Sequence, residues 1–161
     1  MIIDSHCHSW AYWPYQSANS HNPDEPPVPN PETHGNIDQL IYEMDRNKVD
    51  QATVVCAQIW HNPNNNDYLA ENVKKYPGKI HQYADVDSNW SDTHQKPGAA
   101  KRLEAAAEKW PIKGFTHYLD GDDDGSWMDS QDGQDFFGIA NERKLIASIA
   151  GAPHHHTYLR K

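Results

Sequence analysis

Short apolar segments alternate with amphipathic segments along almost the whole chain, and this alternation limits the folds that are open to it. Apolar runs of strand length are separated by segments whose apolar residues recur at helical spacing. Strands that alternate with helices predict a parallel sheet with right-handed crossover connections. We therefore expect an α/β fold with about five parallel strands, at 2–7, 52–59, 80–86, 112–118 and 145–150, and four helices, near 37–44, 66–76, 98–109 and 131–143.

Two architectures satisfy this pattern: an open, flavodoxin-like sheet, and part of an eight-stranded (β/α)8 TIM barrel. A barrel builds its site from the loops that follow its strands, whereas an open sheet gathers its site at one switch point. Polar and aromatic residues follow several predicted strands here, which favours the barrel. These residues are His8, Trp10, Trp60, His61, Asp85, Asp87, Trp90, His117 and His154 to His156. No glycine-rich phosphate loop follows the first strand, which argues against an open-sheet module for a phosphorylated ligand.

The composition of the chain excludes several classes of partner. It has 161 residues, enough for one domain with a sizeable core, and 14 Lys and Arg against 23 Asp and Glu give a net charge of −9. Nucleic acid and anionic membranes repel such a chain, so we expect a small-molecule substrate. No apolar run is long enough to span a bilayer and the start of the chain lacks a secretory signal, which predicts a cytoplasmic protein.

The opening stretch MIIDSHCHSW places two histidines, His6 and His8, one residue apart at the end of the first predicted strand. Side chains alternate along a strand, so these two imidazoles point the same way, roughly 6.5 Å apart along the strand. Two imidazoles at that spacing can converge on one divalent ion, zinc or manganese, at about 2.1 Å each. Asp4 could orient an imidazole as an acceptor. The alternative is a pair of hydrogen-bonded histidines with no ion.

MIIDSHCHSW resembles the opening of the amidohydrolase superfamily, in which such a histidine pair on the first barrel strand supplies two metal ligands. Three further stretches, NIDQLIYEMDRNKVDQATVV, NNDYLAENVKKYPGKIHQYADVD and PIKGF, are similar to the amidohydrolase-related branch. That branch includes 2-pyrone-4,6-dicarboxylate lactonase and aminocarboxymuconate-semialdehyde decarboxylase. The resemblance covers nearly the whole chain. It implies a (β/α)8 barrel and hydrolysis of a lactone or amide, or a related C–C cleavage.

The chain departs from the family pattern at its far end. The family places a histidine after the fifth strand, another after the sixth and an aspartate at the eighth. A full barrel needs about 250 residues, more than this chain has. We therefore expect residues 1–161 to be the N-terminal portion of one barrel domain, truncated after the fifth strand, with weak or absent catalysis. The long loop at 11–35 is expected to be a lid or a disordered segment.

Two alternatives to a metal-dependent hydrolase stay open at this point. One is a non-catalytic fragment that binds metal or self-associates into a homo-oligomer through its open barrel edges. The other is a metal-independent lactonase, or a decarboxylase, of the same branch, because some lactonases of this branch work without an ion.

Several other residues are candidates for the site. One of His154, His155 and His156 is a candidate third metal ligand, because the run follows the fifth strand; the alternative is a solvated stretch near a terminus. His117 is a candidate catalytic residue, or else a hydrogen-bonded polar residue in the barrel wall. Tryptophans that follow strands are candidates for the walls of a substrate pocket, namely Trp10, Trp60 and Trp90. Asp85 and Asp87 are expected to cap loops.

Overall fold

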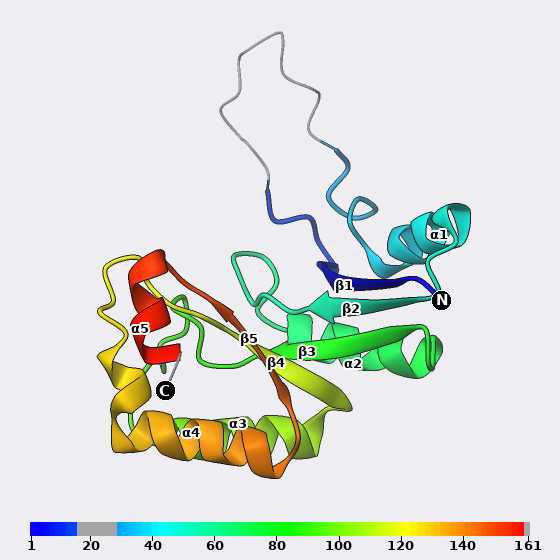
Figure 1. Ribbon diagram of the computed structural model, residues 1–161. Coiled ribbons are helices and arrows are strands. Elements are labelled where there is room, and N and C mark those ends of the chain that lie inside the picture. Colours follow the sequence, from blue (N-terminus) through cyan, green and yellow to red (C-terminus); the bar gives the residue numbers. More distant parts are fainter. Residues whose placement is uncertain (16–28, 160–161) are drawn as a thin grey trace, which may run out of the picture.

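The computed structural model describes residues 1–15 and 29–159. Its five strands form one parallel sheet (Figure 1). They are β1 Ile3–Cys7, β2 Gln51–Val55, β3 Ile80–Asp85, β4 Ile112–Tyr118 and β5 Ile146–Ala150. Their order in space, β1-β2-β3-β4-β5, equals their order in sequence, and every neighbouring pair is parallel. A flavodoxin-like sheet has the order 2-1-3-4-5. The sequential order therefore excludes the flavodoxin-like arrangement and matches the winding of a barrel.

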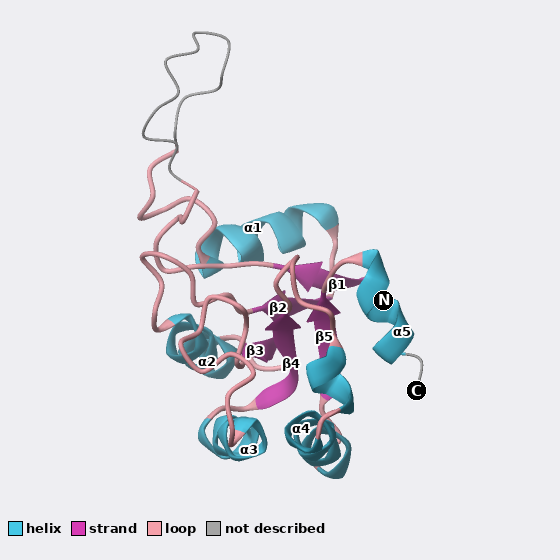
Figure 2. Ribbon diagram, turned by 90° about the vertical axis from the view of Figure 1, so that its left-hand side faces the viewer, coloured by secondary structure: helices cyan, strands magenta, loops and turns pink. Residues whose placement is uncertain are grey.

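The four long helices follow the barrel pattern, with one helix after each of the first four strands. The long ones are α1 Ile37–Asn47, α2 Asn65–Lys75, α3 Ala99–Lys109 and α4 Gln131–Glu142. Short helical segments follow β4 and β5, namely η1 Ser126–Asp129, η2 Pro153–His155 and α5 His156–Leu159. Figure 2 shows α1 to α4 arranged around the curled sheet. The described residues therefore form half of a barrel, as the sequence predicts.

Local signals explain where the helices begin and end. The Asn36 side chain accepts a hydrogen bond from the Gln39 backbone N–H, which caps α1 as expected. α1 ends where Lys48 takes a left-handed conformation, with φ of 58°. The predicted second strand, 52–59, is shorter in the structure because the Gln58 N–H donates to the Asp85 carboxylate, which draws the chain out of the sheet.

The core lies between the sheet and the helices, in two clusters. The first joins β2 and β3 to α1 and α2, and its buried members are Ile37, Met44, Ala52, Val54, Cys56, Leu69 and Ile80. The second joins β3 and β4 to α3, α4 and η1, and is centred on Leu103, Phe115 and Phe136. Since alternate residues of each strand enter these clusters, the intervening residues face the opposite, concave side of the sheet.

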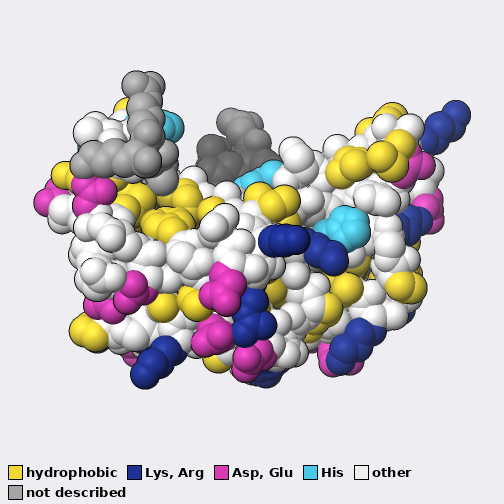
Figure 3. All heavy atoms as spheres, turned by 60° about the horizontal axis from the view of Figure 1, so that its bottom comes forward, with side chains coloured by type: hydrophobic (Ala, Val, Ile, Leu, Met, Phe, Trp, Pro, Cys, Tyr) yellow, Lys and Arg dark blue, Asp and Glu magenta, His cyan; other side chains and the backbone are white. Residues whose placement is uncertain are grey.

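Ion pairs link the outer helices across the convex surface. Arg143 of α4 pairs with Glu104 and Glu108 of α3, and Lys109 of α3 pairs with Asp67 of α2. Figure 3 shows acidic and basic side chains intermixed over this helical face. Each exposed pair contributes at most about 1 kcal/mol, so the helices are held chiefly by the clusters beneath them. No helix in the described part of the chain is both long and apolar enough to cross a membrane.

Candidate functional site

The two histidines of the opening stretch lie at the carboxyl end of β1, beside a bulge in the strand. From Asp4 to Cys7, β1 advances three residues while β2 advances two, from Ala52 to Val54. The Asp4 carboxylate accepts the backbone N–H of His6 across this bulge, at 3.0 Å. Asp4 thus fixes the backbone of His6 instead of orienting an imidazole. Bulges of this kind re-aim side chains next to functional sites.

The two imidazoles converge. The Nε2 atoms of His6 and His8 lie 3.3 Å apart, with the rings edge to face. Two imidazole nitrogens that bind one tetrahedral ion at about 2.1 Å are about 3.4 Å apart. The observed separation is that of a hydrogen bond between the two rings, the ion-free alternative, and it is also compatible with a shared divalent ion. The metal-ligand role of the pair stays a prediction.

A hydrogen bond to the next strand sets the tautomer of His8. Its Nδ1 lies 2.8 Å from the carbonyl oxygen of Val55, at the end of β2. A carbonyl oxygen only accepts, so Nδ1 carries the proton and Nε2 of neutral His8 keeps its lone pair. Burial lowers the pKa of His8 and the neighbouring His6 lowers it further, and together they outweigh the hydrogen bond to Val55, which raises it. The net lowering favours the neutral ring, which is the form that binds a metal.

Aromatic side chains from the loops after β1 and β2 form a chain of ring contacts that begins at His8. Trp10 is buried and stacks flat on the His8 ring, with ring centroids 5.2 Å apart. Tyr15 contacts Trp10 on one side and Trp60 on the other. The buried Trp10 ring therefore supports His8, the candidate metal ligand. Trp60 is 67% exposed and presents part of its ring to solvent.

The third predicted pocket tryptophan, Trp90, lies in the loop after β3. Its indole N–H donates to the carboxylate of Asp85, and its ring packs on Tyr118 of β4. Asp85 also accepts the Gln58 N–H, so its carboxylate ties two loops together. Burial raises the pKa of Asp85. The neighbouring Asp87 forms a buried ion pair with Arg102 instead, which anchors the start of α3.

The histidines after β5 hold loops together. His155 is buried; its Nδ1 accepts the Ala152 N–H and its Nε2 donates to the carbonyl of Asp123, so both ring nitrogens are engaged. His154 is exposed and donates to the same carbonyl, while His156, also exposed, begins α5. Within the described ranges, no three His, Cys, Asp or Glu side chains are grouped closely enough to hold a metal ion. A third ligand from this run stays a prediction.

His117 lies on the helix side of β4. Its ring is fully buried, stacks on Trp127 and packs against Phe136 of α4. Its Nδ1 donates to the carbonyl of Val86, and burial lowers its pKa, so the ring is neutral. This position corresponds to the barrel-wall alternative, and the catalytic role stays a prediction.

Sequence reasoning missed the residues that complete the surroundings of His8. The carbonyl that sets its tautomer belongs to Val55, 47 residues away in the chain. Trp13 and Tyr15, which pack around Trp10, also went unpredicted. The only signal for these two is the dense aromatic run WAYWPY at 10–15 directly after the first strand.

No family model matches the chain, and no curated protein matches its sequence. Solved structures do match its fold. One, named as a probable 2-pyrone-4,6-dicarboxylic acid hydrolase from Acinetobacter baumannii with citric acid bound, has a TM-score of 0.60 at 15% identity over 96% of this chain. Another, named as a putative amidohydrolase from Staphylococcus aureus, has a TM-score of 0.60 at 14% identity over 94% of this chain. The chain therefore shares the fold of the matching halves of these two proteins.

These two matches cover only part of the matched proteins. This chain spans 51% of the Acinetobacter protein and 48% of the Staphylococcus protein, about half of each. A 5-carboxyvanillate decarboxylase from Novosphingobium aromaticivorans, with bound manganese, matches with a TM-score of 0.49 at 22% identity, over 72% of this chain and 35% of its own. That last likeness is too weak to carry an argument. The two stronger ones establish the fold alone.

Proposed function

We propose that this chain forms the metal-binding half of an amidohydrolase-type hydrolase that acts on a lactone, an amide or a similar carbonyl compound. The observation that carries the proposal is the pair of Nε2 atoms, 3.3 Å apart, on His6 and His8. The Val55 carbonyl supports it, because it takes the Nδ1 proton of His8 and leaves the Nε2 lone pair facing His6, where an ion shared by both rings would lie. The pair lies at the carboxyl end of the first strand, where barrel enzymes build their sites.

A divalent ion held by His6 and His8, zinc or manganese, would polarise a carbonyl group and lower the pKa of bound water to about 7. The chain itself orients the ligands. The Val55 carbonyl and the Trp10 ring hold His8 from two sides, and the bulge fixed by Asp4 aims His6. Trp60 and Trp90, both partly exposed, are the candidate walls for a substrate.

Weak catalysis is expected of the chain alone. The described residues supply two converging donors and no third, whereas catalytic zinc sites have three protein ligands. Purified chain should therefore turn over a panel of lactones and amides slowly or not at all. Rapid turnover that survives a His6→Ala/His8→Ala double substitution would contradict the proposed roles of both residues.

The ligand pair can be tested separately from turnover by imidazole NMR. In ¹⁵N-labelled protein, His8 is expected as the Nδ1–H tautomer, and added zinc should shift the Nε2 signals of His6 and His8 first. A His61→Ala variant, which changes an exposed histidine outside the pair, should respond in the same way as the unsubstituted chain. Zinc that perturbs all histidines equally would contradict the proposal.

Self-association is a second candidate property, favoured by the two edges of the half-barrel. β1 and β5 end the sheet, and Ile3 and Ile146 on them are 48% and 59% exposed. Unpaired apolar edge strands recruit further strands. Sedimentation should show a concentration-dependent dimer or larger species, weakened by Ile3→Lys and Ile146→Lys. The control Tyr42→Lys, on the exposed face of α1, should leave it unchanged; a monomer at all concentrations would contradict this property.

A further inference from the structure

Aspartate is followed by glycine at three places in the sequence, at 120–121, 124–125 and 132–133. Such pairs are prone to isomerise. The glycine backbone nitrogen attacks the side-chain carboxyl carbon of the aspartate, a C–N bond forms, water leaves, and a cyclic succinimide results. Glycine favours this step because no Cβ hinders its nitrogen and its backbone turns freely. The step needs a mobile backbone and an accessible carboxyl group, so the structure determines which pair reacts.

The pair at 132–133 is held in the first turn of α4. The Gly133 N–H donates to the Ser130 hydroxyl, which caps the helix. The Asp132 carboxylate accepts the N–H of Gly98 at 3.3 Å. A Cβ at Gly133 would lie 2.2 Å from a backbone oxygen of the preceding turn, so the chain has no room to rotate there. Ring closure at this pair would break the helix cap, and we expect it to be suppressed.

The pair at 124–125 is held as well. Gly125 is buried, its N–H donates to the Asp123 carboxylate at 2.6 Å, and a Cβ there would lie 2.8 Å from the Tyr158 ring. The Asp124 carboxylate accepts the Ser126 N–H at 2.7 Å. Hydrogen bonds from Ser126 lower the pKa of Asp124 below its usual value. The ionised carboxylate resists attack because it has no hydroxyl group to lose, so this pair is protected twice.

The pair at 120–121 lies in the loop that leaves β4, and both of its residues are exposed. A Cβ at Gly121 would meet nothing of the described chain within 4 Å. The Asp120 carboxylate accepts the Asp122 N–H at 3.2 Å, and the Asp120 carbonyl accepts the Asp123 N–H at 3.1 Å. Both bonds stay within one turn. A turn with so few buried contacts opens more readily than a helix end packed on a core.

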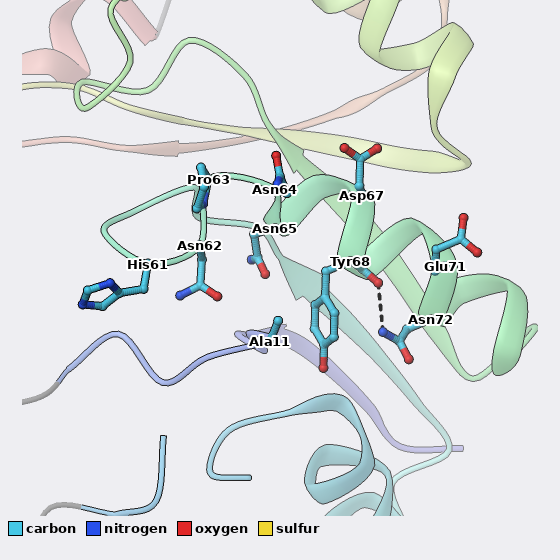
Figure 4. Close-up of a pocket in the computed structure, with 10 residues that line it drawn as sticks. All are labelled: Ala11, His61, Asn62, Pro63, Asn64, Asn65, Asp67, Tyr68, Glu71 and Asn72. Atoms are coloured by element: carbon cyan, nitrogen blue, oxygen red, sulfur yellow. Dashed lines mark hydrogen bonds between the residues drawn. The ribbon is translucent and has the colours of Figure 1, made fainter. Parts of the chain in front are cut away.

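Asparagine forms the same ring by losing ammonia, but no asparagine of the sequence precedes a glycine. The densest group, Asn62, Asn64 and Asn65, lines a cavity at the start of α2 (Figure 4). Asn62 precedes Pro63, whose nitrogen carries no hydrogen. The nitrogen that follows Asn64 donates to the Asn62 carbonyl at 3.1 Å, and Asn65 is buried in the first turn of α2. We expect these asparagines to react more slowly than Asp120.

We propose that Asp120 is a site of spontaneous isomerisation in this protein. The Gly121 nitrogen attacks the Asp120 carboxyl carbon, and the hydroxyl of that carboxyl group leaves as water with the proton of the nitrogen. Water then adds to one of the two carbonyl carbons of the ring and breaks the C–N bond there. Opening at the side-chain carbonyl restores aspartate, whereas opening at the main-chain carbonyl gives isoaspartate, in which the chain runs through the former side chain. This site does not depend on the proposed hydrolase function.

Isomerisation would alter what this loop holds. The Asp123 carbonyl, in the same loop as Asp120, accepts hydrogen bonds from Nε2 of His154 at 2.8 Å and Nε2 of His155 at 2.6 Å. Isoaspartate at 120 lengthens the main chain of the loop by a methylene group, which displaces this carbonyl. We therefore expect η2 and α5, which these histidines begin, to loosen as isoaspartate accumulates.

Isotope labelling locates the reaction. The purified chain is incubated at neutral pH in water enriched in ¹⁸O, and electron-transfer fragmentation then reports label and isoaspartate at each position. Each ring opening adds one ¹⁸O to the carboxylate, so label should enter position 120 at least about tenfold faster than 124 or 132. Gly121→Ala should slow labelling at 120 by a similar factor. Gly138→Ala, at a glycine of α4 with equally open surroundings, should leave it unchanged.

In urea the three pairs should react at similar rates, because the fold no longer distinguishes them. Equal labelling of the three pairs in the folded chain, no labelling at 120, or a preference for 120 that persists in urea would overturn the proposal. Undiminished labelling at 120 in Gly121→Ala would do the same. If that variant does not fold, the ratio of 120 to 132 in the unsubstituted chain decides alone. In ¹⁵N-labelled protein the ring signals of His154 and His155 should shift as isoaspartate accumulates, and unchanged signals would overturn the loosening.

Discussion

Two neighbouring asparagines on α2 should respond very differently to alanine. Asn66 donates to the carbonyl of Asp85 and accepts its N–H, both at 2.9 Å and both buried. Asn65 is equally buried, at 1% exposure, and pairs with nothing in the described chain. Both residues lie in the first turn of the same helix, so the gain in helix propensity on going to alanine is the same for each.

The difference in cost follows from the hydrogen bonds. Asn66→Ala removes two bonds of about 1 kcal/mol each and leaves the Asp85 N–H without its acceptor, for a total loss of about 3 kcal/mol. Asn65→Ala removes two unpaired polar atoms and some packing, and should cost about 1 kcal/mol or less. We therefore expect a gap of about 2 kcal/mol between the two variants.

Urea unfolding, followed by circular dichroism, measures this gap. The two variants should share the same dependence of unfolding free energy on urea concentration, so that the midpoints report stability alone. Equal losses for Asn65→Ala and Asn66→Ala would refute the reasoning, because they would show that Asn65 also has a partner inside the chain.

Three further predictions concern the packing around the sheet. Arg102→Gln leaves the Asp87 carboxylate, which is 2% exposed, without its cation. Urea unfolding should show a loss of about 3 kcal/mol in the free energy of unfolding. A loss under about 1 kcal/mol would contradict the buried ion pair. Burial lowers the pKa of His117 below its usual value of about 6.5, so the unfolded chain binds more protons and the unfolding free energy should fall as the pH drops through about 6.5. His117→Phe should flatten that pH dependence, and an unchanged slope would refute the assignment. On α4, Gly133→Ala places a Cβ 2.2 Å from a backbone oxygen, whereas a Cβ at Gly138 meets nothing within 4 Å. Calorimetry should show a lower melting temperature for Gly133→Ala, because of this clash. Gly138→Ala should raise the melting temperature, since alanine favours a helix by about 1 kcal/mol over glycine. Equal shifts in the two variants would contradict this packing.

Much of the fold could be predicted from the sequence because its signals are local. The apolar runs and helical stripes place the strands and long helices to within a few residues, and Asn36 caps α1 as its position suggests. The sheet order needed one non-local argument, the spread of polar residues over several strand ends. Short helices such as η1 carry no periodicity and were not predicted.

The candidate site was predicted only in part, because its details depend on long-range contacts. The sequence places His6 and His8 together, but the bulge beside His6 and the Val55 carbonyl that sets the His8 tautomer arise from pairing with β2. Likewise, nothing local distinguishes Trp10, buried against His8, from the exposed Trp60. The loop predicted at 11–35 lies partly outside the described residues, which omit 16–28.

Zinc stoichiometry tests the central claim most directly. Equilibrium dialysis followed by elemental analysis should find one zinc per chain in the unsubstituted protein and none in the His6→Ala/His8→Ala variant. A matched double variant, His61→Ala/His81→Ala, removes two histidines outside the pair and should keep the ion. Zinc binding that survives in His6→Ala/His8→Ala, or none in the unsubstituted chain, would contradict the assignment of the converging Nε2 atoms, 3.3 Å apart, as a metal-ligand pair.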